Sequence, residues 1–266
     1  MMDELKKQKM LIFLRDILVS VAIVGIILSA LWGYTGQFPH SPMVVVTSGS
    51  MMHQDSPFGK IGTIDPGDLV LVKKVKTKDD IITRGNSTNP STKHRTYGDY
   101  GDVIIYYPMG NIDRVPIIHR AICWVDVEDG KYTIKEYNIY NASSITIPEL
   151  HLSGYRPKNS GFITKGDNND YPDQIPNGGI CEQPVKPSWI IGKARGEIPW
   201  FGLIKLMFFG NGAGYNGEDA VKIGKAVAPK DEWICLGISL LIIIGLPTGW
   251  DIYNFYKKWK SNKLRL

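Results

Sequence analysis

The chain has 266 residues, 43% of them hydrophobic, which is typical of a globular protein with one large domain or two small ones. Its net charge of +5 is moderate, and the middle of the chain has no basic stripe with interleaved aromatic residues. This pattern argues against nucleic-acid binding, and the basic residues near the two ends point to a membrane instead.

The first predicted element is an apolar helix near the N-terminus. Residues 17–38 carry no charged side chain, and about 20 apolar residues are enough for a helix to span a bilayer. A cleaved signal peptide is the main alternative, but its apolar region usually has only about 7 to 15 residues, and no clean small-x-small cleavage site follows. We therefore predict a cytoplasmic N-terminus at 1–16 and an uncleaved transmembrane helix at 17–38.

The segment 39–210 has the composition of a β-rich domain. Short runs of β-branched and aromatic residues alternate with Gly, Pro, Asn and Asp, as expected for strands separated by turns. These runs lie at 43–48, 68–75, 102–108, 121–127, 131–139 and 188–196. The alternation of strands and helices that builds a parallel sheet does not occur, so the predicted fold class is mainly β.

A second apolar segment precedes the C-terminus, at 232–250, after a predicted Gly-rich linker at 211–231. Its uncharged part, 234–250, is shorter than the ideal of about 20 residues, so a buried core helix is the alternative to a second transmembrane helix. Basic residues flank both apolar segments, including a predicted cytoplasmic tail at 251–266. The positive-inside rule then places both termini in the cytoplasm and the β-rich domain outside a cell membrane.

The three cysteines do not form a metal-binding pattern. Cys123, Cys181 and Cys235 include no Cys-x-x-Cys pair or His-Cys cluster, so we expect no metal and no cofactor. Cys235 lies in the second apolar segment, which leaves Cys123 and Cys181 either as a disulfide, if the domain is extracytoplasmic, or as two buried thiols. Glycosylation sequons at Asn86 and Asn141 fit an external domain but are common by chance.

Ser50 is the best candidate for a nucleophile. A serine hydroxyl needs a base to take its proton and hydrogen-bond donors for the developing oxyanion. Gly49 lets a substrate approach the backbone closely, and Ser48 lies two residues before Ser50, so both hydroxyls can face the same side. Taken alone, Ser-Gly-Ser is ordinary turn composition.

Five histidines are candidates for the base: His40, His53, His94, His119 and His151. Most of them lie in loop-like stretches, but His53 is close to Ser50 in sequence and competes for the role. His119 lies inside a hydrophobic strand, where a buried imidazole needs either a partner or a function. An ordinary core histidine is the alternative for His119.

Acidic residues gather in the segment 161–176, in which a strand-like entry leads to a loop. Asp167, Asp170 and Asp173 lie in the loop that follows, where a carboxylate can orient an imidazole and stabilise its cation. The ligand pattern of a calcium loop is absent from the sequence. The alternative to a catalytic acid is a solvated turn.

In order along the chain, these segments resemble type I signal peptidases, in the archaeal and endoplasmic-reticulum branch related to the Sec11 subunit. The matching motifs are Ser-Gly-Ser-Met at 48–51, the Gly-Asp segment at 66–72, the His-Arg segment at 101–120, Thr-Lys-Gly-Asp-Asn-Asn at 164–169, and the Ile-Gly-Lys-Ala-Arg-Gly segment at 191–202. The resemblance implies a β-sheet catalytic domain of the signal-peptidase and LexA-like type, anchored by transmembrane helices.

The resemblance also implies roles for individual residues. Ser50 matches the nucleophile, and His119 stands where the bacterial branch has a lysine, which implies a Ser-His pair. Asp173 matches the acid beside the base, whereas Asp167 matches a family residue that is either an alternative third member or a structural acceptor. Ser48 matches a hydroxyl of the oxyanion hole, with the backbone N–H of Ser50 as the other donor.

The expected function is that of a membrane-bound serine endopeptidase, which cleaves N-terminal signal peptides from secreted and membrane preproteins by a Ser-His-Asp mechanism. Expected partners are preprotein signal peptides and the lipid bilayer, with the protein-translocation channel as a further candidate and no nucleic acid. The alternatives are a LexA-like self-cleaving protein and a non-catalytic, membrane-anchored β domain. One residue departs from the family pattern, because His53 stands where proline is usual.

Overall fold

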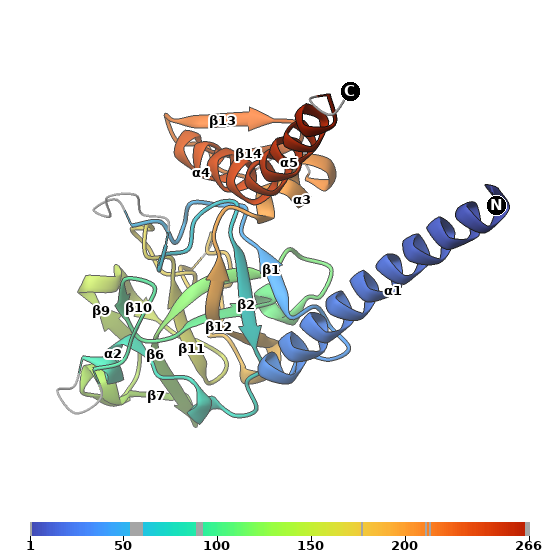
Figure 1. The fold of residues 1–266 in the computed structure, drawn as a ribbon. Helices are drawn as coiled ribbons and strands as arrows, with labels where there is room; N and C mark the ends of the chain where they lie inside the picture. Colours follow the sequence, from blue (N-terminus) through green and yellow to red (C-terminus); the bar gives the residue numbers. More distant parts are fainter. Residues whose placement is uncertain are drawn as a thin grey trace.

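The computed structural model describes residues 2–53, 61–88, 93–176, 178–210, 212 and 214–263. Antiparallel strands form the body of the molecule, and a long helix extends from it at each end (Figure 1). The mainly β fold class predicted from the sequence is confirmed. Each run of β-branched and aromatic residues that predicted a strand contributes to one.

A single eight-stranded sheet forms the centre of the molecule. Seven strands follow one another in space in the order β1 (Met43–Val45), β2 (Leu69–Lys73), β12 (Ile190–Ile198), β5 (Val103–Tyr106), β6 (Ile117–Glu128), β7 (Lys131–Ile134) and β8 (Ile139–Ala142). The eighth strand, β11 (Gly161–Lys165), pairs with β6. Because side chains alternate between the two faces of a strand, neighbouring residues of β6 point to opposite sides.

Three two-stranded hairpins surround this sheet. They are β3 (Arg95–Thr96) with β4 (Asp99–Tyr100), β9 (Ile145–Ile147) with β10 (Leu152–Tyr155), and β13 (Ala220–Ile223) with β14 (Ala226–Pro229). The predicted linker at 211–231 therefore contains a β-hairpin. Ala226 and Ala228 of this hairpin pack with Leu203 and Leu236, so the hairpin belongs to a small apolar cluster.

The helices are α1 (Met2–Thr35), α2 (Arg84–Ser87), α3 (Gly202–Phe209), α4 (Lys230–Leu240) and α5 (Leu246–Lys263), with the π-helical turn η6 (Leu241–Gly245) between the last two. Short 3-10 turns occur at η1 (Lys78–Asp80), η2 (Pro108–Gly110), η3 (Lys135–Tyr137), η4 (Pro148–Leu150) and η5 (Pro187–Trp189). The helix α1 ends before residue 38, because Gly36 adopts a φ of +67° and donates its N–H to the Trp32 carbonyl.

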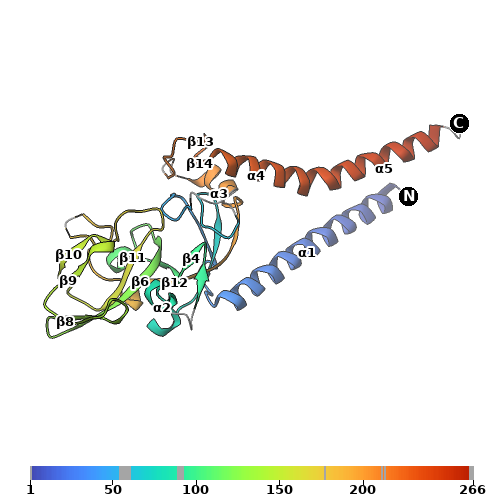
Figure 2. The same ribbon diagram turned by 90° about the vertical axis from the view of Figure 1, so that its left-hand side faces the viewer.

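Among the residues that the structure describes, two helical segments are long and apolar enough to cross a membrane. They are Met10–Thr35, with a mean hydropathy of 2.5, and Lys230–Lys257, with a mean hydropathy of 1.9. None of the most apolar 18-residue window of the first segment is buried, and only 6% of that of the second is, so the alternative of a buried core helix does not fit the second segment. Figure 2 shows both helices leaving the β-sheet body on the same side, an arrangement that fits association with one membrane.

An apolar cluster lies directly beneath the turn that follows β1. Its buried members are Val46, Met51, Ile64, Val70, Val72, Val103, Ile105 and Ala194. Met51 is only 1% exposed, and full burial of a side chain of this size stabilises the fold by about 1.5 to 3 kcal/mol. The residue after Ser50 therefore fixes the turn to the core.

The two cysteines of the β-rich region are free thiols. Cys123 and Cys181 are both buried, and they belong to different apolar clusters. Burial raises the pKa of each thiol above its usual value. Of the two alternatives for these cysteines, the pair of buried thiols is the one found in the structure.

Candidate active site

The candidate nucleophile lies on a tight turn just after β1. The N–H of Met52 donates to the Gly49 carbonyl over 3.2 Å and closes this turn. Asn168 holds the same turn from the other side, since its N–H donates to the Ser50 carbonyl over 2.9 Å and its side chain to the Gly49 carbonyl over 3.0 Å. Ser50 is half-buried, and these contacts fix the backbone that carries its hydroxyl.

His119 connects Ser50 to a buried carboxylate. The ring belongs to β6 and is 2% exposed, as expected for a histidine inside an apolar strand. The Ser50 hydroxyl donates to Nε2 over 2.9 Å, and Nδ1–H donates to the Asp173 carboxylate at distances of 2.8 and 2.7 Å. A carboxylate at Nδ1 favours the tautomer whose Nε2 accepts a proton, which is what a serine nucleophile requires.

Asp173 is itself oriented by two hydroxyl groups that the sequence analysis missed. Tyr106 and Thr164 each donate to Oδ2 of Asp173 over 2.7 Å, and all three side chains are buried. Burial, and then the negative charge of Asp173, raises the pKa of Tyr106 well above its usual value, so Tyr106 remains a donor. The pairing of β5 with β6 could have indicated Tyr106. Ile104 lies opposite His119 in this pair, and Tyr106, two residues further along β5, points to the same face of the sheet as Ile104.

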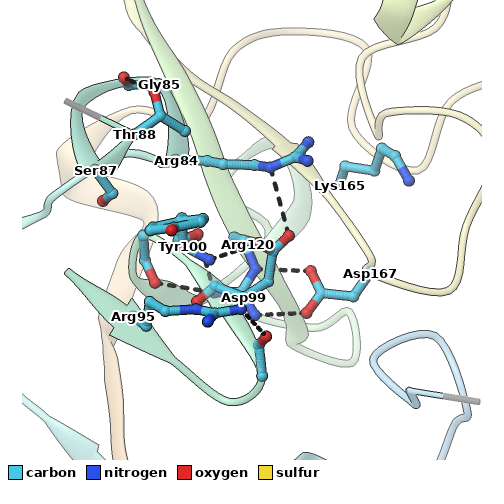
Figure 3. A network of polar contacts seen from close by, with 12 residues as sticks. Arg84, Gly85, Ser87, Thr88, Arg95, Asp99, Tyr100, Arg120, Lys165 and Asp167 are labelled. Atoms are coloured by element: carbon cyan, nitrogen blue, oxygen red, sulfur yellow. Dashed lines mark hydrogen bonds and ion pairs between the residues drawn. The ribbon is translucent and has the colours of Figure 1, made fainter. Parts of the chain in front are cut away.

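Asp167 lies on the other side of β6 and pairs with the next residue of the strand. Arg120 is fully buried and donates from Nε and Nη2 to the two carboxylate oxygens of Asp167, at 2.8 and 2.5 Å (Figure 3). The same guanidinium donates to backbone carbonyls, including those of Thr96 at 3.0 Å and Gly101 at 2.9 Å. Because neighbouring residues of a strand face opposite sides, His119 and Arg120 hold separate acids.

His53 also contacts Asp167. Its Nε2–H donates to Oδ2 of Asp167 over 2.8 Å. Both histidines therefore contact an acid, but it is the Nε2 of His119 that accepts the hydrogen bond of the Ser50 hydroxyl.

An apolar cavity of about 520 Å³ opens beside the Ser50 hydroxyl. One wall comes from residues 44–48, and another from residues 115–119, which include His119. The β1 strand is the end strand of the sheet and pairs on one side with β2, and its residues Val44 and Val45 line this cavity. The Ser48 hydroxyl lies 3.3 Å from the Ser50 hydroxyl and also faces the cavity.

Comparison with known proteins identifies one relevant similarity, while no protein-family model matches the chain. The chain is similar to the signal peptidase complex catalytic subunit SEC11 of Schizophyllum commune, with 29% identity over 167 residues. The match covers 61% of this chain and 62% of the fungal protein, so the chain spans less than two thirds of that relative's length. The predicted Sec11-like resemblance is confirmed.

The other residues singled out in this Sec11-like chain lie apart from the Ser50 hydroxyl. His94 donates to Asp102 over 2.7 Å, and the ring of His151 stacks near Tyr171 with the centroids 4.9 Å apart. Both His40 and Asp170 are exposed. In the part of the chain that the structure describes, no group of three or more His, Cys, Asp or Glu side chains is arranged to hold a metal ion.

Proposed function

We propose that this protein is a membrane-bound serine endopeptidase that cleaves N-terminal signal peptides from secreted and membrane preproteins. The observation that carries the proposal is the chain of contacts from the Ser50 hydroxyl through His119 to Asp173. The similarity to a signal peptidase catalytic subunit supports the choice of substrate class.

In the proposed mechanism, His119 accepts the proton of Ser50 as the serine oxygen attacks the scissile carbonyl. Asp173 stabilises the resulting imidazolium, which then protonates the leaving amine and leaves an acyl-enzyme ester on Ser50. A water molecule gives a proton to His119 and attacks this ester; the acyl–oxygen bond then breaks, His119 returns the proton to the Ser50 oxygen, and the signal peptide leaves with a free carboxyl end. The Ser48 hydroxyl and the Ser50 backbone N–H are the proposed donors to the oxyanion at both steps.

The substrate would bind as an extended segment along the edge of β1. An unpaired strand edge can hydrogen-bond to a peptide backbone, while side-chain pockets read alternate positions. The mostly apolar lining of the cavity beside Ser50 suits small or apolar side chains. The family resemblance further implies small residues at the first and third positions before the cut.

The membrane arrangement forms part of the same proposal. The short segment from the end of α1 to Ser50 spans at most about 3.5 Å per residue, so it keeps the nucleophile close to the membrane if α1 crosses it. We place both termini in the cytoplasm and the β-rich domain outside, with partner subunits and the translocation channel as candidate neighbours. The similar fungal protein is named as a subunit of a complex, which supports a search for such subunits.

A cleavage assay with the full chain in lipid vesicles tests the proposal. The substrate is a preprotein with a defined signal peptide, and the product is identified by its new N-terminus. We expect the wild type to cut once, at the end of the signal peptide, and Ser50→Ala and His119→Ala to show no cutting above background. His40→Ala is the matched control, because it removes an exposed imidazole outside the site. An inert wild type, or variants that cut as fast as the wild type, would contradict the proposal.

A further inference from the structure

His53 occupies the position at which the resembled family usually has proline, and here it makes a specific contact across the site. Its Nε2 lies 2.8 Å from Oδ2 of Asp167. The His53 side chain is 26% exposed and the Asp167 side chain only 7%, so the contact is largely shielded from solvent. A hydrogen bond to a charged and mostly buried acceptor is stronger than a neutral one.

Asp167 is a rigid anchor for this contact. Its carboxylate receives two hydrogen bonds from Arg120, whose side chain is 0% exposed. The guanidinium is fixed in turn by backbone carbonyls of the β3–β4 hairpin region, among them those of Thr96 and Tyr97. A residue that hydrogen-bonds to Asp167 is therefore connected, through Arg120, to strand β6 of the central sheet.

The nucleophile turn is held by two consecutive residues of the loop after β11. Asn168 holds the carbonyls of Gly49 and Ser50, and Asp167 holds His53 just beyond the turn. The ring of His53 also packs closely on Gly98, where an added Cβ would lie 3.1 Å from Cε1. The ring is thus fixed by packing as well as by its hydrogen bond.

We propose that His53 is a positioning residue that holds the Ser50 turn in the geometry needed for attack. Proline at this position would restrict the chain through its fixed φ, and the contact between His53 and Asp167 supplies an equivalent constraint from outside the turn. The inference rests on the proposed peptidase function, because it assigns His53 a part in the same reaction. His53 acts through the turn and does not take the proton of Ser50.

Cleavage kinetics of three variants of the full chain in lipid vesicles test this role. We expect His53→Ala to lower kcat by roughly 10- to 100-fold, since small misplacement of a reacting group is costly, with KM changed by less than about threefold. His53→Gln should recover most of the rate, because its amide N–H can still donate to Asp167 but cannot serve as a base. His40→Ala should match the wild type.

Hydrogen exchange followed by mass spectrometry or NMR provides a readout that does not depend on cleavage. The amides of Met52 and Asn168, which close and clamp the turn, should exchange faster in His53→Ala than in the wild type and recover in His53→Gln. An active wild type with unchanged kcat in His53→Ala, or with His53→Gln as slow as His53→Ala, would overturn the inference. If the wild type does not cleave, the proposed function fails, and unchanged exchange in His53→Ala then overturns the positioning role separately.

Discussion

Replacing Tyr106 by phenylalanine tests how Asp173 supports His119. The change removes the phenolic hydroxyl, which donates to Oδ2 of Asp173 over 2.7 Å, and leaves the buried ring in its apolar cluster. Thr164 still donates to the same oxygen over 2.7 Å, and His119 still contacts the carboxylate. The variant therefore loses one of several hydrogen bonds to this acid and should fold normally.

The size of the effect follows from that loss. A hydrogen bond to a charged group contributes about 1.5 to 3 kcal/mol, and the remaining donor from Thr164 should keep the effect on the barrier near the low end of this range. We therefore expect kcat to fall by roughly tenfold, since each 1.36 kcal/mol corresponds to a factor of ten. KM should change little, because neither hydroxyl lines the cavity.

A variant cycle in the preprotein cleavage assay separates these contributions. Tyr106→Phe, Thr164→Val and the double variant are compared at one pH, with thermal unfolding recorded for each. The double variant should lose more than the sum of the two single losses in free energy, because only it leaves Oδ2 without both hydroxyl donors. The reasoning is refuted if the double variant retains the wild-type kcat while its fold is intact.

Three further predictions concern Arg120, Ser48 and the buried Asp68, whose carboxylate accepts from the N–H groups of Trp200 and Asp65. Arg120→Lys should lower the free energy of unfolding by about 3 to 5 kcal/mol, because it loses the bidentate pair with Asp167 and the hydrogen bonds to backbone carbonyls such as that of Gly101. Denaturant unfolding measures this difference. An unfolding midpoint of Arg120→Lys equal to that of the wild type would contradict this prediction. Ser48→Ala should lower kcat by about 10- to 100-fold with little change in KM, if its hydroxyl stabilises the oxyanion, and steady-state kinetics decide this. Burial raises the pKa of Asp68 from 3.8 to about 8, so the folded state keeps a proton that the unfolded state releases. The stability contributed by Asp68 is thus present below pH 4 and falls as the pH rises towards 8. The unfolding temperature of Asp68→Asn should therefore fall less than that of the wild type as the pH rises from 4 to 8. An equal fall in both proteins would disprove the prediction.

The sequence predicted most of what local patterns control. Runs such as 102–108 and 121–127 became β5 and β6 because β-branched and aromatic side chains suit a half-buried sheet. The predicted linker at 211–231 was assigned less well, because its glycines occur in and around the β13–β14 hairpin, which is stabilised by packing and not by local composition.

The contacts within the site depend on residues far apart in the sequence, which local reasoning cannot pair. Alternation along β6 requires His119 and Arg120 to face opposite sides, but the path of the loop after β11 decides which acid reaches which residue. The same loop gives His53 its partner, Asp167. His53 was unexplained in the sequence for this reason.

The most direct test of the central claim is the cleavage rate of Ser50→Ala, His119→Ala and the double variant, measured under single-turnover conditions with one preprotein. Residues that act as one catalytic unit are not additive, so we predict a loss of about 10⁴-fold or more for each single variant and no substantial further loss in the double variant. All three variants should unfold at temperatures close to that of the wild type. A single variant that keeps its rate within about tenfold of the wild type would contradict the assignment of Ser50 as nucleophile and His119 as its base.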